Sequence, residues 1–275
     1  MNTDAVSPVV PAQGWHVLHL FYHIDHAQWS LLDLDEQRQA KIRLSELVQE
    51  IRATPDTHLL CFSVVTPKAD LGFMILTPDL QMANAYEKQL ALSLGPDILN
   101  PAYSYLSQTE GSEYTTTRDQ YGEETLIREK GMSAGTAEYE TALAEFDERM
   151  AHYLKHRLYP VLPDWPVICF YPMSKRRHGQ DNWYSLPFDE RRKLMAGHAR
   201  VGRTYSGRIL QLITGATGLD EHEWGVTLLA RDTMDIKSIV YEMRFDEVSA
   251  RYGEFGDFYI GLQLPLDQLF RRVCL

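Results

Sequence analysis

The chain contains two copies of one pattern, and this self-similarity restricts its fold more than any other feature. Residues 15–23 and residues 165–172 both begin with tryptophan and continue as an apolar, aromatic-rich strand. A helical stretch follows in each copy, opening with LDEQR at residues 34–38 and with FDERR at residues 188–192. Each copy then continues with two apolar strands, a second helical stretch and an aromatic-rich closing strand.

The order of elements in both copies is therefore strand, helix, strand, strand, helix, strand. This order is the ferredoxin-like pattern, in which helices cover one face of an antiparallel sheet. The later elements are expected at residues 59–65, 70–76, 82–94 and 102–107 of the first copy, and at 209–214, 223–229, 236–248 and 258–264 of the second. We expect an α+β fold of tandem ferredoxin-like repeats, a dimeric α+β barrel within one chain, with antiparallel sheets and helices packed outside.

The chain divides accordingly into four parts. We expect a flexible tail at residues 1–14, an N-terminal half at 15–107, a linker at 108–154 and a C-terminal half at 155–275. The linker is polar and acidic at first and turns helical near Ala137. Residues that could carry chemistry concentrate in the second copy, where the repeat places His198 opposite an aliphatic Leu44 of the first. One working site per chain, in the C-terminal half, follows from this asymmetry.

The composition excludes several classes of partner. A formal net charge of −11 argues against nucleic acid or an anionic membrane, although basic residues that converge locally can still bind an anionic small molecule. The three cysteines, Cys61, Cys169 and Cys274, give neither a disulfide framework nor a metal cluster. The first 14 residues lack a signal-peptide pattern, and no apolar run is long enough to span a membrane. We expect a cytoplasmic protein.

The strand expected at residues 167–175 presents three functional side chains on one face. Because side chains alternate along a strand, Tyr171, Met173 and Lys175 project together, opposite Phe170. The face thus offers a phenol, a soft apolar filler and an ammonium group in a row. The alternative is an exposed strand end with Lys175 in water.

His198 and Gln211 are polar residues at positions expected to be buried. Leu194 and Met195 place His198 on the inward face of its helical stretch, where it is either a satisfied core residue or a ligand. A histidine that ligates a metal usually has its second ring nitrogen held by a partner. Gln211 lies among four aliphatic residues, so its amide either finds a structural partner or faces a cavity and a ligand.

Arg157, Arg244 and Ser249 complete the set of candidates. Guanidinium groups recognise carboxylates with two parallel hydrogen bonds, and Arg244 and Ser249 lie five residues apart near the end of a helical stretch. Each is a weak signal in isolation, because most arginines are solvated surface charges.

Several segments of the second copy resemble the signature sequences of coproheme decarboxylases, which belong to the chlorite dismutase superfamily. The similar segments cover essentially the whole C-terminal half in order, at residues 171–177, 182–184, 191–198, 213–215, 223–227, 242–249 and 252–256. The N-terminal half is similar only in pattern, chiefly at residues 103–105. The resemblance implies an enzyme that converts iron coproporphyrin III, both substrate and cofactor, into haem b with hydrogen peroxide as oxidant.

The resemblance also implies roles for individual residues. His198 matches the histidine that ligates the iron, and Gln211 matches the glutamine on the opposite, peroxide-binding side. Tyr171 matches the tyrosine that is oxidised to a radical and takes a hydrogen from a propionate, and Lys175 matches the lysine that assists the second decarboxylation. The residues implied to hold propionates or to line the pocket are Arg157, Arg244, Ser249, Tyr105 and Met173.

By resemblance we further expect a homopentamer and a transient contact with coproporphyrin ferrochelatase. Three alternatives stay open. A chlorite dismutase would carry a distal arginine where this chain has Gln211, and a haem-binding or haem-transfer protein would need His198 without Tyr171. A scaffold for protein association would need neither. If His198 is not the axial ligand, the candidates are His152, His156 and His178.

Overall fold

The computed structural model describes residues 7–275, so the first six residues of the predicted tail 1–14 lie outside it. The elements of the N-terminal half are, in order, β1 (His16–Ile24), α1 (His26–Leu31), α2 (Leu34–Ala53), β2 (His58–Val64), β3 (Leu71–Thr77), α3 (Leu80–Leu92) and β4 (Leu99–Thr109). Three helical segments follow: α4 (Arg118–Gln120), the π-helical η1 (Tyr121–Glu129) and α5 (Ala137–Leu158).

The C-terminal half repeats the order of the first and adds short elements near its end. Its first elements are β5 (Val167–Lys175), a 3-10 turn η2 (Trp183–Ser185), α6 (Phe188–Arg203), β6 (Ile209–Gly215) and β7 (Trp224–Ala230). The remainder comprises α7 (Thr233–Met243), α8 (Glu247–Tyr252), β8 (Gly253–Phe255), β9 (Tyr259–Gln263) and α9 (Leu266–Arg272). The predicted α+β fold with two ferredoxin-like repeats is confirmed.

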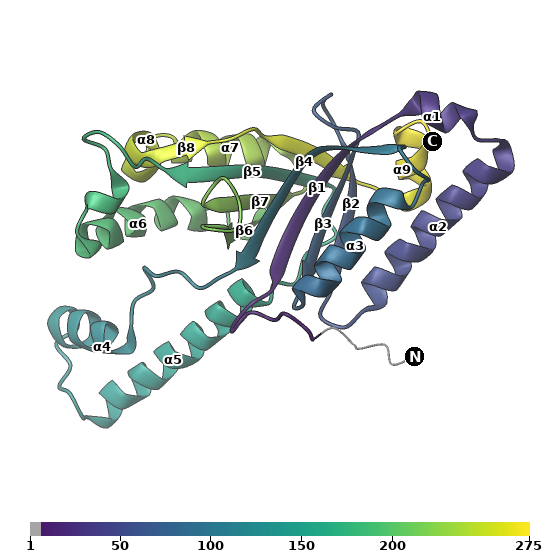
Figure 1. The fold of residues 1–275 in the computed structure, drawn as a ribbon. Helices are drawn as coiled ribbons and strands as arrows, with labels where there is room; N and C mark the ends of the chain where they lie inside the picture. Colours follow the sequence, from purple (N-terminus) through teal and green to yellow (C-terminus); the bar gives the residue numbers. More distant parts are fainter. Residues whose placement is uncertain (1–6) are drawn as a thin grey trace.

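The strands of the two halves join into one antiparallel sheet. Its order is β7-β6-β4-β1-β3-β2-β9-β5-β8, and an additional pairing of β5 with β7 closes the first eight strands into a barrel. The halves meet at two short seams, β4 with β6 and β2 with β9. In Figure 1, α2 and α3 cover the sheet of the N-terminal half, and α6, α7 and α8 lie beside that of the C-terminal half.

Alternating side chains of each strand divide the apolar residues into a barrel interior and two outer layers. On β5, Ile168 and Phe170 point into the interior, which both halves fill. Cys169 and Tyr171 point outward into the layer between the C-terminal strands and α6 and α7. The corresponding outer layer of the N-terminal half is apolar, with Leu44 fully buried in it. The outer face of β5 is therefore the one that meets the helices of its own half.

One predicted helix is interrupted. Residues 236–248 were expected to form a single helix, but α7 ends at Met243 and α8 begins at Glu247. Asp246 explains the break, because its side chain accepts a hydrogen bond from the Val248 backbone N–H and so caps the start of α8. The break turns the chain between Arg244 and Ser249.

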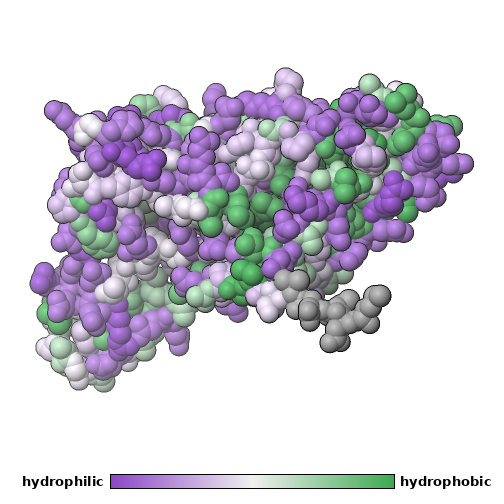
Figure 2. Space-filling model, viewed as in Figure 1, coloured by the Kyte–Doolittle hydropathy of each residue, from purple (hydrophilic) through white to green (hydrophobic). Residues whose placement is uncertain are grey.

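The visible face of the molecule is largely hydrophilic, with smaller apolar groups near its middle (Figure 2). Among the residues that the structure describes, no helix is long and apolar enough to cross a membrane.

Candidate active site

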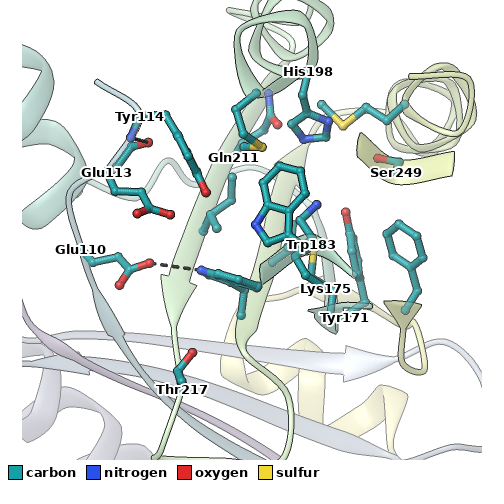
Figure 3. A pocket seen from close by; sticks show the side chains of 18 of the residues that line it. Glu110, Glu113, Tyr114, Tyr171, Lys175, Trp183, His198, Gln211, Thr217 and Ser249 are labelled. Carbon is teal, nitrogen blue, oxygen red and sulfur yellow. Dashed lines mark hydrogen bonds between the residues drawn. The ribbon is translucent and has the colours of Figure 1, made fainter. Parts of the chain in front are cut away.

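A cavity of about 340 Å³ lies between the outer face of β5, β6 and β7 and the helices α6, α7 and α8 (Figure 3). It is in the C-terminal half, where the sequence asymmetry predicted the site. All but one of the predicted site residues line it: Arg157, Tyr171, Met173, Lys175, His198, Gln211, Arg244 and Ser249. The fold thus brings together residues that span nearly a hundred positions of the chain.

His198 reaches the cavity from α6 and is held by a carboxylate. Its Nδ1 lies 2.7 Å from Oδ2 of Asp246, so that Nε2 is the nitrogen left for a ligand. Burial raises the pKa of Asp246, but hydrogen bonds from His198, the Val248 N–H and Ser249 outweigh this effect and hold the pKa below its usual value. Asp246 is therefore an ionised partner that fixes the ring orientation and increases the basicity of the free nitrogen.

Tyr171 projects from β5 into the same cavity. Only 6% of its surface is exposed, and its ring stacks on Phe258 with a centroid distance of 4.3 Å. Burial, together with the neighbouring Cys169, raises the pKa of the phenol, which Arg244 only partly opposes. The phenol therefore stays protonated at neutral pH.

Lys175 is buried, with 6% of its surface exposed, so the alternative of a solvated strand end is wrong. Its Nζ lies 5.1 Å from the centroid of the Trp183 ring, a cation–π contact. Burial lowers the pKa of Lys175 to about 8, although Asp246 and Glu223 act in the opposite direction. An ammonium with a pKa near neutrality can give and regain a proton under physiological conditions.

Gln211 lies on β6 and faces α6. Its Nε2 donates a hydrogen bond of 3.1 Å to the Gly202 carbonyl, and its side chain also lines the cavity. A Cβ on Gly202 would come within 3.2 Å of Gln211 Nε2, so the glycine lets strand and helix approach at this point. The Gln211 amide therefore has both features that the sequence analysis gave as alternatives, namely a structural partner and a position at the cavity.

Two arginines flank the cavity. Arg157 lies in the last turn of α5, and its Nε donates to the Glu110 carbonyl at 3.1 Å. The Arg244 guanidinium lies 4.2 Å from the centroid of the Phe255 ring, at the end of α7. Ser249 adds a hydroxyl from α8. These donors suit carboxylates that extend from an apolar ring.

Tyr105 is not brought to the cavity. It is fully buried inside the barrel, where its hydroxyl donates to the His222 carbonyl at 3.1 Å. The reason is the alternation along β4, which turns this side chain inward once β4 pairs with β1. We therefore omit Tyr105 from the proposed site.

The other histidines considered as axial ligands also lie away from the cavity. His152 and His156 are exposed on α5 and contact each other, and His178 is 81% exposed in the loop after β5. Within residues 7–275, His198 is the histidine that lines the cavity.

Three residues of the site have roles that sequence reasoning did not assign: Asp246, Trp183 and Glu223. Trp183 is buried on the cavity wall, and Glu223 accepts hydrogen bonds of 2.7 Å from the Lys175 backbone N–H and the Tyr184 hydroxyl. Glu223 thereby ties the end of β5 to η2. All three lie in the segments that carried the family resemblance, but nothing local in the sequence shows which groups they contact.

The loop after β4 adds an acidic rim. Glu110 and Glu113 line the cavity near Tyr114, and Glu110 accepts a hydrogen bond from the Trp224 indole N–H at 3.2 Å. Burial raises the pKa of Glu110, an effect that Trp224 and Arg157 counteract. The basic and acidic groups are thus mixed at this rim.

The donor set fits an iron porphyrin. One imidazole has a free nitrogen and an anionic partner on the other, which is the usual environment of a histidine that ligates a metal. The walls are mostly apolar, with Ile213, Val226, Val240 and Met243 among them, and suit a flat macrocycle. Arg157 and Arg244 can meet its carboxylates.

Comparisons with known proteins define the class. The family model described as chlorite dismutase matches residues 37–264. A structure described as a novel haem-binding protein from Thermus thermophilus is 39% identical, with a TM-score of 0.78, and the match covers 98% of this chain and 99% of that one.

The chain therefore belongs to the chlorite dismutase family, whose members are haem oxidoreductases. Two structures of chlorite dismutase from Candidatus Nitrospira defluvii share the fold. A double variant is 15% identical, covering 96% of this chain and 98% of that one, and an imidazole complex is 14% identical, covering 96% and 97%; both have a TM-score of 0.71. At this identity the likeness concerns the fold alone.

Proposed function

We propose that the protein binds iron coproporphyrin III and, with hydrogen peroxide, converts two of its propionate groups into vinyl groups to give haem b. The observation that carries the proposal is the position of Tyr171. A buried, protonated phenol shares one cavity with a carboxylate-oriented imidazole and a buried lysine. Haem binding alone would need the imidazole but not this phenol or the lysine beside it.

His198 would hold the iron through Nε2, with Asp246 fixing the ring. Met195 and Met243 would pack against the macrocycle from the helix side, and Ile213 and Val226 from the sheet. Gln211, which approaches from β6 toward α6, would supply an amide on the side from which the oxidant enters. His198 comes from α6 and Gln211 from β6, so the two side chains would reach the macrocycle from different elements.

Arg157, Arg244 and Ser249 would hold the propionates. A substrate with four carboxylates needs local positive charge, and the two arginines supply it within a protein whose net charge is −11. Fixing the remaining arms is what brings one chosen arm to Tyr171, because a hydrogen transfer needs the reacting atoms in near contact.

In each decarboxylation, one propionate, one hydrogen peroxide and one proton would give one vinyl group, one carbon dioxide and two water molecules. An iron porphyrin held by His198 would, together with peroxide, supply the oxidising equivalents. Tyr171, oxidised to its radical, takes a hydrogen atom from the carbon beta to the carboxylate; carbon dioxide then leaves as the second electron is removed. Lys175 would hold or deliver the proton at its Nζ.

The comparisons suggest two other functions, namely chlorite breakdown on bound haem and haem binding without catalysis. Gln211 stands where the first would employ a cationic arginine to steer an oxyanion, and an amide lacks that charge. The haem-binding relative from Thermus thermophilus keeps the second open.

The experiment that separates the three uses the purified protein in two parallel assays. The protein loaded with iron coproporphyrin III is titrated with hydrogen peroxide, and the haem-loaded protein is given chlorite. We expect stepwise conversion of the porphyrin to haem b and little oxygen release. Rapid oxygen release without porphyrin conversion would establish the chlorite reaction instead, and neither product would leave haem binding.

A further inference from the structure

Two exposed histidines on α5 form a pair that the proposed reaction does not use. His152 and His156 are one helical turn apart, their Nε2 atoms are 3.0 Å from each other, and their ring centroids are 4.3 Å apart. We propose that this pair is a separate surface site for a divalent transition-metal ion of the Cu(II) or Ni(II) type. The proposal does not depend on the proposed function of the cavity.

The distance between the two nitrogens favours this class of ion. Metal–imidazole bonds are about 2.0–2.1 Å long, so two such bonds at a right angle hold their nitrogens about 2.9 Å apart. A tetrahedral angle would separate them by about 3.3–3.4 Å. The observed 3.0 Å corresponds to neighbouring positions of a square-planar or octahedral ion, which Cu(II) and Ni(II) prefer.

The helix presents the pair in a fixed arrangement. Residues four apart on a helix lie on the same face, and the 22-residue α5 carries both rings in its last two turns. Without a metal, one ring must donate its Nε2–H to the Nε2 lone pair of the other across the 3.0 Å contact, and a bound cation would replace this hydrogen between the two nitrogens. The partial negative charge at the C-terminal end of a helix also favours a cation there.

The site is chemically distinct from the cavity. Neither histidine lines the cavity, whereas the next residue along, Arg157, does. Among the described residues, no group of three or more histidine, cysteine or acidic side chains is placed to hold a metal. Water would therefore fill the other coordination positions, which gives an open and exchangeable site of moderate affinity.

The test titrates the purified protein with Cu(II), Ni(II) and Zn(II) separately, by calorimetry, and records the electron paramagnetic resonance spectrum of bound Cu(II). His152→Ala and His156→Ala each remove one imidazole from an exposed surface. His178→Ala removes an exposed histidine elsewhere, and His198→Ala removes the one in the cavity.

We expect one Cu(II) equivalent whose spectrum shows two coordinating imidazole nitrogens, and Ni(II) binding tighter than Zn(II). Each α5 variant should weaken this binding at least tenfold and leave one nitrogen in the spectrum, whereas His178→Ala and His198→Ala should leave both unchanged. The proposal is overturned if the tightest site persists in both α5 variants, if it is lost in His198→Ala, or if Zn(II) binds more tightly than Ni(II).

Discussion

The Nδ1 atom of His198 lies 2.7 Å from Oδ2 of Asp246, a residue 48 positions further along the chain. The same carboxylate caps α8 through the Val248 N–H, so it links the orientation of the imidazole to the position of the helix that carries Ser249. One acidic side chain therefore sets the geometry of both the candidate iron ligand and a candidate propionate contact.

Replacing Asp246 removes its charge and one or both of its acceptor oxygens. Oδ2 lies against His198 and Oδ1 accepts from the Val248 N–H. Asp246→Asn removes the negative charge and keeps one acceptor oxygen, whereas Asp246→Ala removes the charge and both acceptors. We expect Asp246→Ala to weaken iron porphyrin binding about 10–100-fold, because the partner of a ligating histidine has effects of this size. The iron–histidine stretching frequency in the ferrous complex should fall in both variants. An unchanged frequency in Asp246→Ala would refute the role given to this pair.

His198→Ala should leave the iron of a bound porphyrin without its protein ligand. The Soret band of the bound porphyrin is expected to shift and the affinity to fall, since the remaining contacts are apolar packing and carboxylate pairing. His178→Ala is the matched control, because that ring is exposed outside the cavity. An identical spectrum for His198→Ala and the wild type would mean that another group ligates the iron.

Lys175 makes folding stability depend on pH in a defined direction. Burial lowers its pKa to about 8 from the 10.5 expected in the unfolded chain, so between these values the unfolded state binds more protons. The contribution of Lys175 therefore becomes more favourable as pH rises from about 8 to about 10.5. Below pH 8 the buried charge lowers the free energy of unfolding by about 3 kcal/mol at most.

The uncharged variant Lys175→Met tests this assignment in the apoprotein. It should be more stable than the wild type at pH 7, and the difference in the free energy of unfolding should shrink as pH rises through about 8. Chemical denaturation at several pH values gives both quantities. A constant difference across this range would show that Lys175 is not buried as an ammonium.

Glu223 is expected to hold the backbone of Lys175 in place. Its carboxylate accepts from the Lys175 N–H and from the Tyr184 hydroxyl, each at 2.7 Å. Glu223→Gln turns one of the two acceptors into a donor, which should lower the free energy of unfolding by about 1–3 kcal/mol. Combining it with Tyr184→Phe should cost less than the sum of the single changes, because the two residues share one bond. Strict additivity would argue against the link.

The repeat made most of the fold predictable, because strand alternation and helix openings are local signals that occur twice. The break between α7 and α8 was missed, since a cap such as Asp246 interrupts a helix without interrupting its apolar pattern. Tyr105 shows the limit for sites. Whether an alternating strand turns a residue into the barrel depends on how β4 pairs, and that pairing is a long-range property.

The features of the site that the sequence did not predict are contacts between residues far apart in the chain. Tyr171, Lys175 and His198 were identified because they lie on recognisable faces of their elements. The bond between His198 and Asp246 and the two bonds of Glu223 join segments whose approach only the closed barrel determines.

The most direct test of the account measures product masses for Tyr171→Phe. The variant keeps the ring and its stacking on Phe258 but lacks the hydroxyl. Loaded with iron coproporphyrin III and given hydrogen peroxide, it is predicted to bind the porphyrin like the wild type and to leave all four carboxyl groups in place. Loss of two carboxyl groups at the wild-type rate would contradict the central claim.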